Sequence, residues 1–166
     1  MYRFLIILFC LMSTTTAFAG KGSFSRFGVG LKTYDSKSWG DVKTLNFGYQ
    51  DEFSGALSWF DYKLEVGGWV DNANNGRKSG GFAGSSIGVE PRVGVFYINA
   101  FFGAAAVFPT DAMLGSTFQF MEDIGLGVGD QRGVRVGVNY KHLSNAGLWL
   151  PNRGRDFFTV QVQLPW

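Results

Sequence analysis

The feature that most constrains the fold is a two-residue alternation of apolar and polar side chains along several segments of the chain. In the last segment the large apolar side chains are Phe158, Val160, Val162, Leu164 and Trp166, and the polar ones between them are Thr159, Gln161 and Gln163. Successive side chains of a β-strand point to opposite faces. The alternation therefore predicts strands with one apolar face and one polar face.

The polar faces of these strands carry charges of both signs. Asp61, Lys63 and Glu65 alternate with large apolar residues, and Arg135 and Lys141 lie on the face opposite Val134, Val136, Val138 and Tyr140. A soluble barrel would enclose the apolar faces, but here the apolar faces are the bulkier ones. The interior of an eight-stranded barrel is just wide enough for side chains. We therefore expect glycines and paired charges inside, and apolar side chains against lipid.

The spacing of the alternating segments predicts eight strands. They fall at 23–33, 42–50, 58–69, 82–90, 92–103, 118–128, 133–144 and 156–166. Outer-membrane barrels have short periplasmic turns and longer external loops. Tight turns are expected near 51–57, 90–92 and 129–133, and external segments near 34–41, 70–81, 104–117 and 145–155. The expected fold class is all-β: an eight-stranded antiparallel transmembrane β-barrel.

Some segments fit this pattern less well. The fourth and fifth strands alternate poorly. Glu122 shares the parity of Phe120 and Ile124, which predicts either a bulge in the sixth strand or an error in its assigned register. The alternative fold is a secreted soluble β-sandwich. The final strand favours the barrel, because its terminal Trp166 suits an assembly signal for outer-membrane insertion.

The N-terminus has the pattern of a secretion signal. Arg3 is followed by an apolar run at 4–12 and by the small-x-small site Ala17-Phe18-Ala19. A membrane anchor helix is the alternative, but the apolar run is too short to span a bilayer. We expect a signal peptide at 1–19, an outer-membrane β-barrel domain at 20–166, and a multi-pass protein of the outer membrane of a Gram-negative bacterium.

Charge and composition exclude several classes of function. The formal net charge is +2, so nothing favours a nucleic-acid partner. The single cysteine, Cys10, lies inside the predicted signal, and the chain has one histidine. These numbers leave little for a transition-metal site, and no glycine-rich segment precedes a helix as a dinucleotide site requires. We therefore expect no metal and no cofactor.

The single histidine lies in a constellation with a serine and a carboxylate. His142, Ser144 and Asp156 are all even-numbered, the parity predicted to face outward in the last two strands. All three should meet on the outer wall at the external rim. Uncompensated polar groups are costly there, which favours a functional role.

These residue types match nucleophilic ester hydrolysis. A serine hydroxyl attacks when a histidine takes its proton, and a carboxylate orients the histidine. Donors for the oxyanion are available in the connecting loop, at Asn145, Gly147 and Asn152. The alternative is a non-enzymatic barrel, an adhesion or membrane-stabilising protein, in which His142 is an interfacial residue.

The same segment resembles a known family. His142-Leu143-Ser144-Asn145-Ala146-Gly147, followed by Asn152-Arg153-Gly154-Arg155-Asp156, is similar to the active-site signature of the outer-membrane lipid A 3-O-deacylases, the PagL family. A weaker similarity, in size, in the eight strands and in Phe118-Gln119-Phe120 followed by Gly125-Leu126-Gly127, spans the rest of the predicted barrel.

The resemblance implies an esterase that removes the 3-hydroxyacyl chain from the 3 position of lipid A. It implies His142 as base, Ser144 as nucleophile and the acid at 156 as orienter, with Gly147 and Asn152 at the oxyanion and Asn145 nearby. The expected partners are lipid A or lipopolysaccharide and the surrounding outer-membrane lipids. Whether the protein is a monomer or a homodimer stays open.

Three cations flank the signature: Lys141, Arg153 and Arg155. They are either solvated charges at the rim or ligands for the phosphates of a lipopolysaccharide head group.

One departure from the signature yields a prediction. A member of the family that this segment resembles carries glutamate at the position of Asp156, which is one methylene shorter and could reach His142 more loosely. Asp156→Glu should keep or raise ester hydrolysis, and Asp156→Ala should lower it by about an order of magnitude or more, because an unsupported histidine is a poorer base. Wild-type turnover in a folded alanine variant would remove Asp156 from the mechanism.

Overall fold

The computed structural model describes residues 24–33, 42–52, 57–71, 79–110, 114–130 and 132–165. The predicted signal peptide at 1–19, the terminal Trp166 and the predicted loop at 34–41 lie outside these residues. The strands are β1 (Phe24–Thr33), β2 (Val42–Glu52), β3 (Asp61–Asp71), β4 (Gly80–Val89), β5 (Arg92–Val93), β6 (Phe96–Phe108), β7 (Phe118–Gly129), β8 (Arg135–Ser144) and β9 (Arg155–Pro165).

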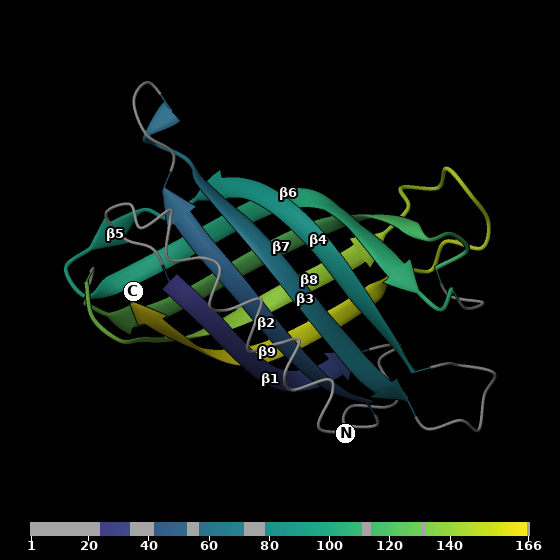
Figure 1. Cartoon of the computed structure of the whole chain (residues 1–166), viewed down its shortest axis with the longest axis horizontal. Helices are drawn as coiled ribbons and strands as arrows, with labels where there is room; N and C mark the ends of the chain where they lie inside the picture. The colour runs from purple at the N-terminus through teal and green to yellow at the C-terminus, as the bar shows by residue number, and fades with distance from the viewer. Residues whose placement is uncertain are drawn as a thin grey trace, which may run out of the picture.

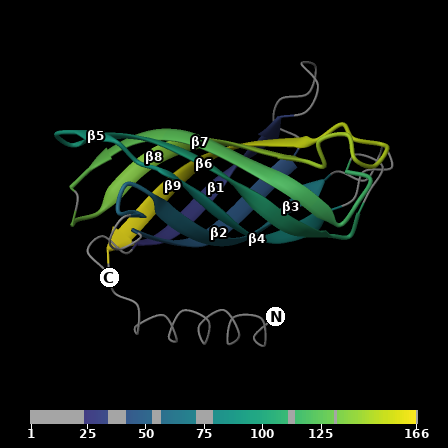
Figure 2. The same cartoon turned by 90° about the horizontal axis from the view of Figure 1, so that it is seen from above.

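The eight long strands form a ring of antiparallel pairs. Each pairs with its neighbours along the chain, β4 pairs with β6 across the short β5 hairpin, and β1 pairs with β9 to complete the ring (Figures 1 and 2). This confirms the predicted eight-stranded antiparallel barrel. We call the end at which residues 145–154 join β8 to β9 the external rim, after its predicted orientation, and the opposite end the periplasmic rim.

The connection from β4 to β6 differs from the prediction of one strand at 92–103. The chain makes a small hairpin in which Arg92 pairs with Tyr97 and Val93 with Phe96. Gly94 has a φ of 60°, a backbone conformation that favours glycine and permits the reversal. β6 then continues to Phe108 and includes residues 104–108, which the sequence had assigned to a loop. The alanines at 104–106 alternate too weakly to mark that strand.

The predicted bulge at Glu122 is wrong. β7 pairs residue for residue with β6 and with β8 through this position, where Glu122 lies opposite His142. Glu122 is exposed on the outer wall. Its even position therefore places the Glu122 carboxylate on the apolar outer wall of the barrel.

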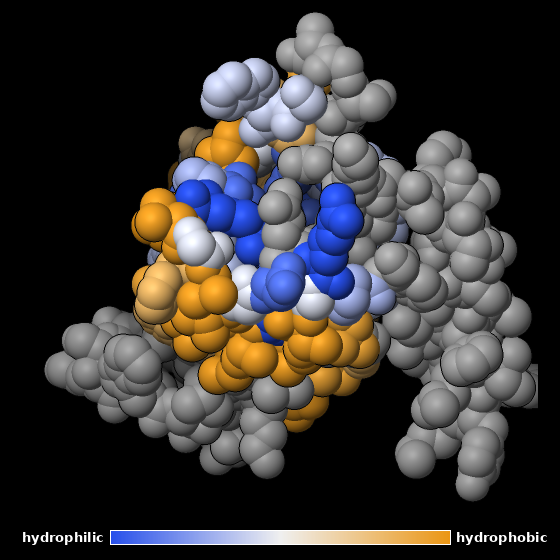
Figure 3. All heavy atoms as spheres, turned by 90° about the vertical axis from the view of Figure 1, so that its left-hand side faces the viewer, coloured by the Kyte–Doolittle hydropathy of each residue, from blue (hydrophilic) through white to orange (hydrophobic). Residues whose placement is uncertain are grey.

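The two faces of the barrel have the predicted polarity. On β8 the outward Val136 and Val138 are 45% and 48% exposed, whereas Asn139 and Lys141 point inward and are buried. Seen from the periplasmic end, hydrophilic residues gather near the middle, and hydrophobic ones flank them to the left and below (Figure 3). An apolar wall around a polar interior is the distribution of a barrel that sits in lipid. Within the described residues, no helix is long and apolar enough to cross a bilayer.

Four charges meet in the middle of the barrel. Lys63 pairs with Asp123 and lies 3.4 Å from Glu65, and Lys141 pairs with Glu65 and lies 3.2 Å from Asp123. The two lysines are 1% exposed. Two cations and two carboxylates cancel, which makes their burial tolerable because each charge has an opposite neighbour.

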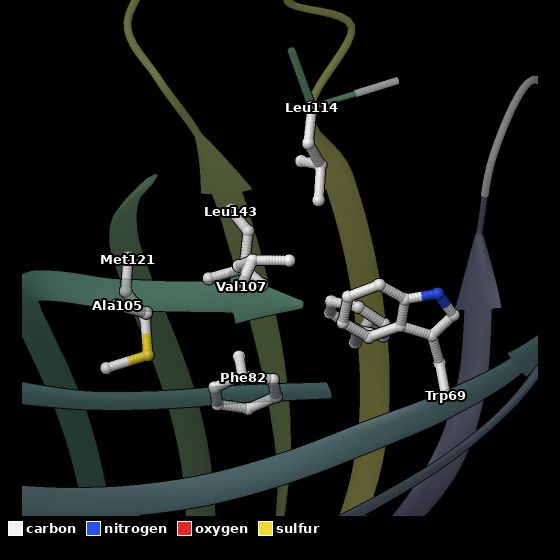
Figure 4. Packing of buried hydrophobic residues seen from close by; sticks show 8 residues of the cluster. Trp69, Phe82, Ala105, Val107, Leu114, Met121 and Leu143 are labelled. Atoms are coloured by element: carbon white, nitrogen blue, oxygen red, sulfur yellow. The ribbon is translucent and has the colours of Figure 1, made fainter. Parts of the chain in front are cut away.

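The external third of the interior corrects the expectation of a polar filling throughout. It holds an apolar plug made of Trp69, Phe82, Ala105, Val107, Leu114, Met121, Leu143 and Phe157 (Figure 4). The guanidinium of Arg155 lies 4.7 Å from the ring centre of Trp69. The barrel is therefore closed by packed side chains at the rim where the polar outer-wall residues lie.

Removing one interior charge should destabilise the barrel. Lys63→Met leaves the carboxylates of Glu65 and Asp123 with only Lys141 as a counter-ion, and breaking a buried pair typically costs about 3–5 kcal/mol. Folded and heat-unfolded barrels migrate differently on a gel. The temperature at which the protein changes from the folded to the unfolded mobility should fall in this variant. Arg132→Met, which removes an exposed cation, should leave that temperature in place; equal temperatures for the two variants would contradict the role of the four-charge cluster.

Candidate active site

The sequence-predicted triad lies on the outer wall at the external rim. His142 pairs with Asp156 across β8 and β9, and Ser144 is the last residue of β8. The side chains of His142 and Asp156 are 28% and 31% exposed. Together with Tyr140 and Glu122 they form a polar patch on an otherwise apolar surface.

His142 and Asp156 are in direct contact. Nδ1 of the imidazole lies 2.6 Å from Oδ1 of the carboxylate. A histidine that donates Nδ1–H to a carboxylate keeps Nε2 as its basic nitrogen. The looser reach expected of the shorter aspartate is therefore not observed, because the strand pairing places the two residues directly opposite each other.

Ser144 lies two residues from His142 on the same strand and face, a separation of about 6.6 Å along the backbone. Its side chain is half-buried. Among the described residues, no hydrogen bond joins the Ser144 hydroxyl to the imidazole. Such bonds are often long without substrate and tighten when it binds. The structure brings His142 and Asp156 together and places Ser144 beside them.

Asn145 organises the loop that follows β8. Its side chain donates to the carbonyls of Leu114 (2.8 Å) and Trp149 (2.7 Å) and accepts from the Gly147 N–H at 3.0 Å. Its backbone N–H donates to Asn152 Oδ1 at 3.0 Å. Asn145 is completely buried. The donors of Asn145 and the N–H of Gly147, predicted at the oxyanion, are thus already engaged, within this loop and with Leu114 of the β6–β7 connection.

Asn152 keeps a donor for a substrate. Its Oδ1 accepts the Asn145 N–H, which turns the Nδ2 group of the same amide the other way. In the part of the chain that the structure describes, no acceptor binds that Nδ2 group, and the residue is half-exposed. Of the three predicted oxyanion residues, Asn152 is the one whose side-chain donor remains available.

Two neighbours of His142 were missed by the sequence analysis. Tyr140 donates a hydrogen bond of 2.7 Å to Asp156 Oδ1. Gly154 has a φ of 66° and packs so closely that a Cβ there would lie 2.6 Å from His142 Cε1. The shared even parity of Tyr140 could have signalled its place, but nothing in the sequence marks Gly154 as a neighbour of the imidazole.

Two of the three flanking cations do not lie at the solvated rim, where the sequence analysis expected them. Lys141 and Arg155 point into the barrel and are 1% and 0% exposed, because their odd parity is that of the interior face. Arg153 is exposed in the loop. In the described ranges, no group of three or more histidine, cysteine or acidic residues is arranged to hold a metal ion.

Comparison with known proteins places the chain in a family. The family model described as lipid A 3-O-deacylase (PagL) matches residues 27–165. The chain belongs to this family. It is 45% identical over 64 residues to the lipid A deacylase PagL of Bordetella bronchiseptica, covering 37% of this chain and 36% of that protein. It is 39% identical over 87 residues to the PagL of Pseudomonas aeruginosa, covering 51% of this chain and 46% of that protein. The matched stretches thus span less than half the length of these curated relatives.

Solved structures show the same fold. The crystal structure of the outer-membrane enzyme PagL superposes with a TM-score of 0.70 at 22% identity, covering 86% of this chain and 99% of that one. Neisserial surface protein A superposes with a TM-score of 0.61 at 9% identity, covering 87% and 96%. At these identities the superpositions support the barrel fold alone.

The close packing of Gly154 gives a prediction for this member of the PagL family. Gly154→Ala places a methyl group against the imidazole of His142 and should lower kcat by about 10- to 100-fold, because small displacements of the candidate base are costly. Gly94→Ala is the matched control: it has a similar φ of 60° but nothing within 4 Å of the added carbon. Kinetic assays of both folded variants check this; an equal loss in both would point to backbone strain alone.

Proposed function

We propose that the protein is an outer-membrane esterase that removes the ester-linked 3-hydroxyacyl chain at the 3 position of lipid A. The observation that carries the proposal is the contact of His142 with Asp156, 2.6 Å apart on the outer wall beside Ser144. Membership of the lipid A 3-O-deacylase family supports the choice of substrate. In this proposal residues 1–19 direct export to the outer membrane of a Gram-negative cell.

The residues divide the reaction between them. His142 Nε2 takes the proton of the Ser144 hydroxyl as its oxygen attacks the ester carbonyl, and Asp156 stabilises the imidazolium that forms. The imidazolium then protonates the sugar oxygen, and the bond from the carbonyl carbon to that oxygen breaks. A water molecule, deprotonated by the same nitrogen, hydrolyses the acyl-serine and releases the fatty acid.

Asn152 is our candidate for stabilising the tetrahedral intermediate. Its Nδ2 group is the predicted donor that the loop leaves available, and a donor aimed at the developing oxyanion commonly contributes a factor of about 10²–10³ in rate. Asn145 and Gly147 contribute by holding the loop in the shape that presents Asn152.

The surroundings suit a substrate that stays in the membrane. Phe118 and Phe120 on β7 pack edge to face, and Phe120 stacks on Phe102 of β6. These rings lie on the outer wall next to Ser144, since Phe120 is the strand partner of Ser144. An acyl chain of lipopolysaccharide could lie along them while its ester meets the serine.

Mass spectrometry of lipid A tests the proposal. Cells that express the wild type should lose one ester-linked 3-hydroxyacyl chain, and Ser144→Ala and His142→Ala should each reduce the rate by on the order of 10³-fold or more, since the members of a triad act as a unit. Ser85→Ala, which removes an exposed serine from β4 of the outer wall, should be neutral. Unchanged lipid A mass with folded wild type would favour the non-enzymatic barrel.

A further inference from the structure

Two donors from one strand meet on one carboxylate oxygen. The Tyr140 hydroxyl donates to Asp156 Oδ1 at 2.7 Å, and the same oxygen lies 2.6 Å from His142 Nδ1. Tyr140 and His142 are two residues apart on β8, so both reach the carboxylate from the same face. The position of Asp156 is therefore fixed by Tyr140 as well as by His142.

The ring of Tyr140 is itself held in place. Tyr140 is the strand partner of Phe158, and the two ring centres lie 5.1 Å apart at an interplanar angle of 52°. Tilted aromatic pairs of this kind are attractive. The half-buried ring therefore delivers its hydroxyl to one place on the outer wall.

Asp156 needs such support more than a glutamate would. Its side chain is 31% exposed, so water competes for the carboxylate. A glutamate at this position would have one more methylene and a longer reach toward the imidazole. We propose that Tyr140 is a positioning residue whose hydroxyl holds the short carboxylate of Asp156 against His142. Its kinetic consequence rests on the proposed esterase function, whereas the positioning itself does not.

The competing explanation is that Tyr140 is an interfacial aromatic residue whose ring, not its hydroxyl, matters. Tyr140→Phe separates the two because it keeps the ring and its contact with Phe158. Tyr49→Phe is a matched control: the Tyr49 hydroxyl donates to Asp51 Oδ2 at 3.0 Å near the periplasmic rim. Both variants lose one hydrogen bond to a carboxylate, but only one of those carboxylates touches His142.

Kinetics in two backgrounds test the pairing. Tyr140→Phe should lower kcat by about ten-fold with little change in KM, a typical effect of losing a hydrogen bond to a charged group. In the Asp156→Glu background the same change should cost less than about two-fold, because the longer acid does not need the tyrosine. Tyr49→Phe should be neutral in both. Equal losses from Tyr140→Phe in the two backgrounds, or no loss in either, would overturn the proposal.

A second measurement does not depend on turnover. The chain has one histidine, so after selective ¹⁵N-histidine labelling all imidazole signals in the NMR spectrum come from His142. The Nδ1–H proton should be visible at low field in the wild type, in Tyr49→Phe and in the double variant that combines Tyr140→Phe with Asp156→Glu. In Tyr140→Phe alone this proton should be lost to exchange with water. Wild type without deacylase activity but with this pattern would refute the proposed function and support the positioning role. A proton unchanged in Tyr140→Phe would refute the positioning role whatever the activity.

Discussion

The rest of the structure depends on one constraint: backbone polar groups that face lipid must be satisfied within the protein. A closed ring of strands does this without free edges, which is why pairing of β1 with β9 completes the sheet. Once the ring is closed, the two-residue period assigns every strand residue either to lipid or to the interior. A slip of one residue would place Lys141 and Arg155 in lipid and His142 in the interior, so the register is strongly specified.

The polar patch is a local exception to this sorting. Tyr140, His142, Ser144 and Asp156 lie on the lipid-facing parity, with Glu122 across from His142 on β7. The patch limits the cost of its polar groups in two ways. Tyr140 and His142 are joined to Asp156 by hydrogen bonds, and the patch lies at the rim, where water can reach it.

Much of the fold could be predicted from the sequence, because the alternation of apolar and polar residues can be read from one chain. The barrel, most strand positions and the outward placement of His142, Ser144 and Asp156 all follow from parity. The hairpin at β5 could not be predicted, since it depends on the backbone conformation of Gly94. The apolar plug was missed because its members come from distant strands and from Leu114 in a loop, and each of them alone resembles an ordinary strand or loop residue.

The details of the candidate site were harder to predict than its membership. From the sequence, Asn145, Gly147 and Asn152 were equivalent candidate donors. Their roles differ because most of their hydrogen-bonding groups bond to other groups of the protein. Asn145 forms hydrogen bonds with Leu114, Trp149, Gly147 and Asn152. No spacing rule reveals which amide is left over. The same holds for Gly154, whose contact with the imidazole exists only after the loop has folded back.

The interior explains why a site on an exposed wall can be held in one geometry. The inward neighbours of His142 are Lys141 and Leu143, and those of Asp156 are Arg155 and Phe157; all four are at most 1% exposed. Lys141 is fixed by two carboxylates, and Leu143 and Phe157 belong to the apolar plug. The strand pair that carries the histidine and the acid is thereby packed from behind, which fixes the backbone positions from which its outward side chains project. The charge cluster and the plug hold the backbone beneath the polar patch, and the hydrogen bonds of Asp156 to Tyr140 and His142 align the side chains above it.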